Sequence, residues 1–295
     1  GFGEAYQQFV AGGWQGLPFD PEFGGLGLPR ALSLAVSEMM HGANMSFALA
    51  PMLTLGAIEA LQAHGTAQQK ATYLPKLISG EWTGTMNLTE PQAGSDVGAL
   101  TARAVPQDDG SFRIFGQKIY ITWGDHDMAA NTIHLVLART PSAPIGSRGV
   151  SLFIVPKFLP KPDGTLGHRN DVRCIGLEHK MGIHGSPTCT MAYGEVDGAI
   201  GWLIGEENKG LAAMFTMMNS ARLNVGIQGV GVAEAAFQKA FEYAQERKQG
   251  KAEGWSEAGP SPILHHADVR RMLMTMKAKV AAARAICFST AVAAD

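Results

Sequence analysis

The chain has 295 residues and carries two kinds of hydrophobic pattern, helical at both ends and strand-like in the middle. Between residues 31 and 80 apolar side chains such as Leu32, Ala35 and Met39 recur at the helical spacing, which predicts helices. Thr66 to Gln69 has the Thr-x-x-Gln pattern of a capping box, so a helix should begin there. Pro75 is expected to end or bend that helix.

From about residue 84 the pattern changes to that of strands. Residues 112–122, 132–139 and 149–155 are runs of β-branched and aromatic residues bounded by Gly, Pro, Asp and Asn. No helical pattern separates these runs, so parallel βαβ units and a Rossmann nucleotide site are not expected. An antiparallel barrel or sandwich is favoured for the middle of the chain.

After residue 207 the helical period returns. One stripe holds Leu211, Met214, Phe215 and Met218, and further apolar stripes run through 230–244 and 269–287. A polar, glycine-rich break at 249–262 separates the last two, so we expect two long helices joined by a surface loop. Their apolar faces are too wide for two helices to cover, which indicates further helices or another subunit as partners.

Charge and composition narrow the class of protein. The 24 Lys and Arg and the 26 Asp and Glu give a net charge of −2, which argues against a nucleic-acid binder because phosphate binding needs a basic surplus. Charged residues make up 17% of the chain, and 36 residues are glycine. A chain with so little charge is expected to cover much of its surface with partners or a large cofactor.

Cysteine usage and hydropathy bear on the compartment. The chain has three cysteines, too few and too far apart for a disulfide framework or a zinc site, so no metal is expected and a reducing cytoplasm fits best. Two apolar stretches are interrupted by charged residues, one by Arg222 and Glu234 and the other by Lys277, Lys279 and Arg284. Neither stretch is expected to span a membrane.

Residues 86–98 (MNLTEPQAGSDVG) form the most informative segment. Pro91 forces Glu90 out of helical geometry, and Gly94 and Ser95 follow near Thr89, so amides and hydroxyls crowd into one loop. Such a loop can hydrogen-bond a flat heterocycle or a phosphate. A tight turn held by its own local hydrogen bonds is the alternative.

The segment TEPQAGSDVG is similar to the TEPGAGSDV motif of the acyl-CoA dehydrogenase family, flavoproteins that oxidise acyl-CoA thioesters to 2-enoyl-CoA. Three further segments, 65–84, 114–124 and 205–248, resemble family motifs in the same order. The resemblance covers roughly residues 20–290. The loop that follows YAQERK and runs to Pro262 resembles a longer-chain subclass that includes methylmercaptopropionyl-CoA dehydrogenases.

The resemblance implies an α+β multidomain fold around FAD. An N-terminal helical domain would occupy residues 1–84, a middle antiparallel β-barrel or sandwich domain residues 85–204, and the first helices of a C-terminal four-helix bundle residues 205–295. The hydrophobic patterns agree with this plan.

The resemblance also implies a flavin site. Two groups of residues would line the flavin from opposite flanks, and two loop residues would lie where the FAD pyrophosphate and the CoA portion of the substrate approach each other. The flavin-lining residues would be Met86, Leu88, Thr89, Tyr120, Ile121 and Thr122, and the loop residues Gly94 and Ser95. A hydroxyl donor near flavin N5, implied for Thr122, would stabilise the charge that arrives with the hydride. Ordinary strand alternation is the other explanation for Tyr120 and Thr122.

Further positions are implied on the first bundle helix. Asn219 and Arg222 would lie near the CoA end and the thioester, and Arg222, flanked by apolar residues, should need an anionic or carbonyl partner. Arg247 would reach across a subunit interface to the partner's FAD pyrophosphate, or would complement the helix dipole.

Dehydrogenation needs a carboxylate to remove the α-proton, and none of the matched positions supplies one. In a minority of the family the base lies immediately before the bundle arginine, but here that residue is Ala221. Glu90 matches a structural position. The base is therefore expected beyond Asp295.

The family resemblance further implies an acyl-CoA substrate, electron-transferring flavoprotein as the electron acceptor, and a homodimer or homotetramer. Two rival functions stay open. One is a flavin oxidase that passes electrons to oxygen, and the other is a non-catalytic relative that binds nucleic acid, which the charge balance disfavours.

Overall fold

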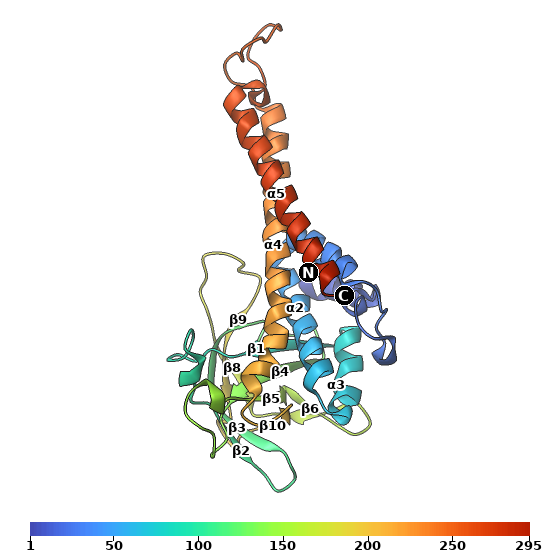
Figure 1. Cartoon of the computed structure of the whole chain (residues 1–295), viewed down its shortest axis with the longest axis vertical. Coiled ribbons are helices and arrows are strands. Elements are labelled where there is room, and N and C mark those ends of the chain that lie inside the picture. Colours follow the sequence, from blue (N-terminus) through green and yellow to red (C-terminus); the bar gives the residue numbers. More distant parts are fainter. The chain divides into compact units, whose positions relative to one another are not determined.

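The computed structural model describes residues 1–295, which form two compact units (Figure 1). The first unit consists of residues 1–28 and 46–222, and the second of residues 29–45 and 223–295. Two long helices, α2 (Arg30–His64) and α4 (Gly210–Glu246), contribute to both units. Inside α2 the backbone leaves helical geometry at Asn44, with φ −158° and ψ 95°.

The first unit is built on an eight-stranded sheet with the strand order β1-β4-β5-β10-β3-β9-β8, and β2 pairs with β3. The strands are β1 (Trp82–Asn87), β2 (Arg103–Pro106), β3 (Phe112–Thr122), β4 (Asn131–Ala138), β5 (Ser151–Pro156), β8 (Val172–Leu177), β9 (Thr188–Tyr193) and β10 (Ala199–Ile204). A separate hairpin is formed by β6 (Phe158–Pro160) and β7 (Leu166–Arg169). The three strands predicted from the sequence are confirmed as β3, β4 and β5.

The sheet is mostly antiparallel, as predicted, but it does not close into a barrel. One pair departs from the prediction, because β1 and β4 run parallel, with Trp82 opposite Asn131. No helix joins them; the connection contains β2 and β3, which pair elsewhere in the sheet. Strand β10 pairs with β3 through its first half and with β5 through its second half, so it links the two parts of the sheet.

Helices α1 (Phe2–Ala11) and α3 (Ala67–Ser79) complete the first unit. The predicted capping box is present, since the Gln69 amide donates to Thr66 Oγ1 at 3.2 Å and the Thr66 amide to Gln69 Oε1 at 2.9 Å. Of the two effects predicted for Pro75, ending or bending the helix, the first is wrong: α3 continues to Ser79 and ends at Gly80, whose φ of 81° few other residues adopt. Short 3₁₀ turns cover Trp14–Gly16, Pro21–Phe23, Val97–Ala99 and Ser147–Gly149.

One face of the sheet packs against helices within the first unit. Ile133, Leu135 and Leu137 of β4 share a buried cluster with residues of α2, α3 and the first turns of α4. The approach is close at Gly84 of β1, where a Cβ atom would lie 2.4 Å from Cβ of Ala57. Strand β1 is thereby held directly against α2, and its C-terminal end has a fixed position within the unit.

The second unit pairs α4 with α5 (Ala267–Ala293), which run side by side and are joined by residues 247–266 (Figure 1). This confirms the two predicted long helices and their connecting loop, which includes a 3₁₀ turn at Ile263–His265. Arg284 of α5 bridges Glu38 and Glu234 at 2.6 and 2.9 Å. Ile286 and Met274 are 68% and 70% exposed, which leaves wide apolar faces on α5, as expected.

Helix α2 is the one helix that is long and apolar enough to cross a membrane by length and composition alone. The two apolar stretches that the sequence suggested as candidates, and that charged residues interrupt, lie instead in α4 and α5. In the most apolar part of α2, 67% of the residues are buried inside the protein, as in the core helix of a globular protein.

Candidate functional site

The loop that follows β1 lies along β3, just before Tyr120. The Ile119 amide donates to the Thr89 carbonyl at 2.9 Å, and Lys118 Nζ donates to the Leu88 carbonyl at 3.0 Å. Two segments that are about thirty residues apart in the chain, and that were predicted to flank one cofactor, are therefore neighbours. Both lie within the first unit.

A buried ion pair fastens this junction. Lys118 Nζ lies 2.8 Å from Glu90 Oε1, and the two side chains are 0% and 2% exposed. Glu90 also accepts hydrogen bonds from the Thr101 amide at 2.7 Å, the Ala102 amide at 3.1 Å and Gln92 Nε2 at 2.7 Å. Burial alone would raise the pKa of Glu90, but the Lys118 charge and these hydrogen bonds lower it. Glu90 is thus an ionised carboxylate whose oxygens are already engaged.

Strand β3 has a bulge immediately after Lys118. Its register against β9 shifts between Lys118 and Ile121, and Tyr120 has a φ of 60°, unusual for an aromatic residue. The Tyr120 side chain is 59% exposed, whereas Ile121 is 2% exposed and belongs to the sheet core. The predicted contribution of Ile121 to a cofactor site can therefore come only from its main chain.

The bulge is held in place on its far side by Trp123. Its φ is 52°, its amide donates to the Pro187 carbonyl at 2.8 Å, and its indole Nε1 donates to the Ser46 carbonyl at 3.1 Å. These bonds link β3 to the loop before β9 and to α2. Strained backbone persists only where its surroundings hold it, and here they do so beside an exposed aromatic ring.

The remaining residues of the predicted flavin set differ in exposure. Met86 and Leu88 are half-buried and pack against the cluster shared by the sheet and helices, while Gly94 and Ser95 are exposed. The hydroxyls of Thr89, Ser95 and Thr122 make no hydrogen bond to another residue of the chain.

These features match what a flat, polar heterocycle requires. Two half-buried threonine hydroxyls, Thr89 and Thr122, are free to donate, and an exposed aromatic ring, Tyr120, lies beside them. A Cβ atom at Gly94 would meet only Thr89 Cγ2, at 3.7 Å, so the loop has room for a ligand. The chain contains no group of three His, Cys, Asp or Glu side chains that could hold a metal ion.

Arg139 holds the loop that carries Ser95. Its Nε donates to the Leu100 carbonyl at 2.9 Å, Nη1 to Pro144 at 2.9 Å, and Nη2 to Gly146 at 2.8 Å and to Gly98. One guanidinium group thereby ties residues 98–100 to the loop after β4.

The sequence analysis missed both Lys118 and Arg139. A signal existed for Lys118, because it has the same strand phase as buried Ile114. No comparable signal marks Arg139, whose four acceptors are backbone carbonyls in two irregular loops.

Asn219 and Arg222 lie together on α4. Arg222 Nη1 donates to Asn219 Oδ1 at 2.6 Å, and the guanidinium lies 5.4 Å from the centre of the Phe215 ring. Arg222 is exposed, and its partners within the chain are the side-chain carbonyl oxygen of Asn219 and the Phe215 ring. Phe215 is itself 39% exposed, although the sequence pattern assigned it to a buried stripe.

Arg247 lies at the C-terminal end of α4, in the second unit. It is exposed, and its Nη2 donates to Gln249 Oε1 at 3.0 Å. The guanidinium makes no other hydrogen bond or ion pair within the chain, which leaves its remaining donors available to a ligand or another chain.

Three family models match the chain in order. They are the N-terminal domain of acyl-CoA dehydrogenase at residues 2–81, its middle domain at residues 85–196 and its C-terminal domain at residues 208–295. The fold and these matches define a protein with an N-terminal helical part, a middle sheet and C-terminal helices. The chain belongs to the acyl-CoA dehydrogenase family.

Individual relatives support the same family assignment. The chain is 52% identical to 3-methylmercaptopropionyl-CoA dehydrogenase of Ruegeria pomeroyi over 98% of this chain and 49% of that protein. It is 31% identical to the short-chain specific acyl-CoA dehydrogenase of Megasphaera elsdenii, over 98% of this chain and 70% of that one. The chain spans about half the length of the first curated relatives it matches.

Solved structures show the same fold. A chain from work on the electron transferring flavoprotein of Acidaminococcus fermentans gives a TM-score of 0.84 at 26% identity, covering 98% of this chain and 70% of that chain. The structure of an acyl-CoA dehydrogenase complexed with FAD from Bacillus anthracis gives a TM-score of 0.81 at 27% identity. The match covers 98% of this chain and 45% of that chain.

Proposed function

We propose that the protein binds FAD and catalyses the α,β-dehydrogenation of an acyl-CoA thioester to 2-enoyl-CoA. The observation that carries this proposal is the junction of β1 with the β3 bulge, where free hydroxyls and an exposed aromatic ring lie side by side. FAD, when bound, supplies the acceptor for a hydride. The family membership and the FAD-bound relative support the choice of cofactor.

The residues of the junction have separate roles in this proposal. Met86 and Leu88 keep water from the flavin ring, Thr89 donates to its pyrimidine side, and the Thr122 hydroxyl donates near N5. Tyr120 and the main chain of Ile121 cover the flank of the ring. The rigid bulge sets the position of Thr122 before the ligand arrives, so no reorganisation is needed at the moment of reaction.

Anionic portions of cofactor and substrate are assigned to the polar loops. The Gly94 amide and the Ser95 hydroxyl meet the pyrophosphate and CoA, and Arg139 keeps this loop in place. Asn219 and Arg222 contact the CoA end of the substrate from α4. Arg247, which is exposed, reaches the FAD pyrophosphate of another subunit in a homodimer or homotetramer.

The reaction removes a proton from the α-carbon and a hydride from the β-carbon, and the proton needs a base. Glu90 is excluded because Lys118 and two amides engage its carboxylate, and residue 221 is alanine. We propose that the base is a carboxylate that is not among residues 1–295.

The partners follow from the same proposal. Electron-transferring flavoprotein is the proposed acceptor, and a relative in this structural class comes from work on that protein. A reducing cytoplasm is the proposed location, consistent with three free cysteine thiols. The proposed domain division is 1–84, 85–204 and 205–295.

Anaerobic mixing of the FAD-loaded full-length protein with a saturated acyl-CoA tests the activity. We expect the visible flavin absorbance to bleach and one enoyl-CoA to form per flavin reduced. After oxygen is admitted, stoichiometric peroxide with rapid turnover would indicate the oxidase instead. A preparation that binds no flavin, or a flavin that stays oxidised with every acyl-CoA, would contradict the proposal.

A further inference from the structure

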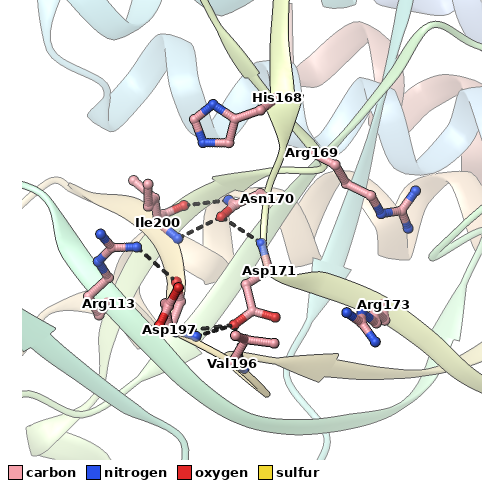
Figure 2. Close-up of a pocket in the computed structure, with 10 residues that line it drawn as sticks. Arg113, His168, Arg169, Asn170, Asp171, Arg173, Val196, Asp197 and Ile200 are labelled. Atoms are coloured by element: carbon pink, nitrogen blue, oxygen red, sulfur yellow. Dashed lines mark hydrogen bonds between the residues drawn. The ribbon is translucent and has the colours of Figure 1, made fainter.

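A polar pocket of about 330 Å³ lies in the first unit, and nothing in the proposed reaction uses it (Figure 2). Its lining includes three arginines, one histidine and two aspartates, from β3, β7, β8 and the turn between β9 and β10. They are Arg113, His168, Arg169, Arg173, Asp171 and Asp197. A pocket of this size can enclose a small ligand.

The floor of the pocket is rigid. Asn170 is 6% exposed, and its Nδ2 donates to the carbonyls of Pro156 at 2.9 Å and Ile200 at 2.8 Å. Its Oδ1 accepts from the amides of Ile200 and Asp171 at 2.8 and 2.9 Å. One buried amide thereby ties the end of the β6–β7 hairpin to β10, so the charged residues around it stand on a fixed frame.

One of the two aspartates already has three hydrogen-bond donors. Asp171 Oδ2 accepts three successive amides of the β9–β10 turn, from Val196 at 2.8 Å, Asp197 at 3.0 Å and Gly198 at 3.1 Å. Figure 2 shows these bonds converging on the carboxylate. Three amides that meet at one oxygen form an anion nest, and here the protein's own carboxylate fills it.

Each of the three lining arginines has fewer side-chain hydrogen bonds than Asp171 has. Arg113 donates only to the Gly198 carbonyl, at 3.2 Å, and the exposed Arg173 makes no hydrogen bond. Arg169 has an ion pair with Asp125 Oδ2 and a hydrogen bond to the Val172 carbonyl, both long at 3.4 Å, and lies 5.7 Å from the centre of the Phe158 ring. In Figure 2 Arg113 lies on one side of Asp171, and Arg169 and Arg173 lie on the other. Three guanidinium groups and two carboxylates line the pocket, so the lining keeps a positive charge surplus even with both aspartates ionised.

The pocket is separate from the flavin junction. Arg113 is the second residue of β3, and Tyr120 lies seven residues further along it. At about 3.3 Å per strand residue, the two are roughly 20 Å apart. A ligand in the pocket therefore does not compete with the flavin or the thioester for space.

We propose that this pocket is a second anion site that binds the phosphate group of a small phosphorylated ligand. A tetrahedral phosphate presents three or four acceptor oxygens, so it can accept from more than one donor of a lining guanidinium group, and Arg113 and Arg173 have few or no hydrogen bonds of their own. A carboxylate has only two coplanar oxygens and suits such an arrangement less well. The ordered floor keeps the entropy lost by the protein on binding small.

Titration calorimetry of the FAD-loaded full-length protein with inorganic pyrophosphate and with inorganic phosphate tests the proposal. We expect saturable binding with one site per chain, weakened at least ten-fold in Arg173→Gln and in Arg113→Gln. Arg173 makes no hydrogen bond, so its replacement should leave the thermal unfolding temperature and the flavin content unchanged. Arg270→Gln, which removes an exposed arginine of α5, is the matched control and should bind pyrophosphate as the wild type does.

Two results would overturn the inference. One is no saturable heat with either probe at millimolar concentration. The other is an equal loss of binding in Arg173→Gln and Arg270→Gln, which would reduce the effect to net charge. If the first result came together with arginine-dependent retention of an acidic protein, the pocket would be a protein-docking surface.

Discussion

Replacing Lys118 with methionine should lower the free energy of unfolding by about 3–5 kcal/mol, because Lys118→Met leaves the Glu90 carboxylate buried without its cation. The same change should release the loop after β1, since Lys118 also donates to the Leu88 carbonyl. We therefore expect the purified full-length variant to lose most of its FAD. Urea denaturation and the flavin-to-protein absorbance ratio measure the two effects.

Two controls separate the buried ion pair from a general effect of losing a lysine. Lys76→Met removes a 2.6 Å partner of Glu81 at the surface and should cost less than about 1 kcal/mol. The double variant Lys118→Met, Glu90→Gln removes the orphaned charge while keeping an acceptor oxygen for one of the Thr101 and Ala102 amides, so part of the stability should return. Equal losses in Lys118→Met and Lys76→Met would contradict the account.

The ion pair also predicts an acid dependence. The folded state lowers the pKa of Glu90 below its ordinary value of 4.5, so the unfolded chain binds the proton more tightly. The stabilisation by Glu90 is thus fully present above pH 4.5 and is lost as the pH falls through the lower, folded-state pKa. In Lys118→Met this part of the acid dependence should be absent or reversed.

Arg139→Gln is the second substitution with a large expected effect. It removes the donor shared by the carbonyls of Gly98, Leu100, Pro144 and Gly146, and a buried carbonyl left unpaired, as at Leu100, costs about 1–3 kcal/mol. The exposed loop with Ser95 should then lose its fixed position. We expect the KM for acyl-CoA to rise about ten-fold, with a smaller change in kcat, because positioning is lost while the flavin junction is kept.

Arg139→Lys and Arg103→Gln complete this test. A lysine keeps the charge but cannot bridge four carbonyls, so it should recover only a small part of the lost affinity. Arg103 forms a β-bridge with Arg139 through its main chain, but its exposed side chain lies over the Phe115 ring and makes no hydrogen bond, so its replacement should leave KM unchanged. A fall in kcat with constant KM in Arg139→Gln would show that the clamp does not position the CoA loop.

The sequence predicts this fold best where the signals are local. The Thr66 capping box and strand β3 were found because each depends on residues a few positions apart. The parallel pairing of β1 with β4 was not, because β2 and β3 intervene and no short pattern encodes such a distant pair. The predicted end of the helix at Pro75 failed for a related reason. The packing of Leu74 and Leu77 in the core, which is a tertiary effect, outweighs the lost helical hydrogen bond.

In the candidate site, too, features encoded by local motifs were predicted and features that depend on distant pairing were not. Motif resemblance selected Thr89 and Tyr120, and the structure brings their segments together through the Ile119 amide. The β3 bulge was not predicted from the alternation of apolar and polar residues. A one-residue insertion in the strand reverses which side chains face the core. It explains why Ile121, proposed as a flavin neighbour, has its side chain in the sheet core.

In the proposed reaction, the β3 bulge directs the Thr122 hydroxyl to the bound flavin, and the other assignments at the junction depend on this role. The direct measurement is the rate at which saturating acyl-CoA bleaches the flavin anaerobically in full-length Thr122→Val. Loss of one hydrogen bond to a charged group costs about 1.5–3 kcal/mol, so bleaching should slow about ten- to a hundred-fold while flavin content is retained. Thr72→Val, the same change at a half-buried α3 threonine that makes no hydrogen bond, should bleach at the wild-type rate. Equal rates in wild type and Thr122→Val would contradict the central claim.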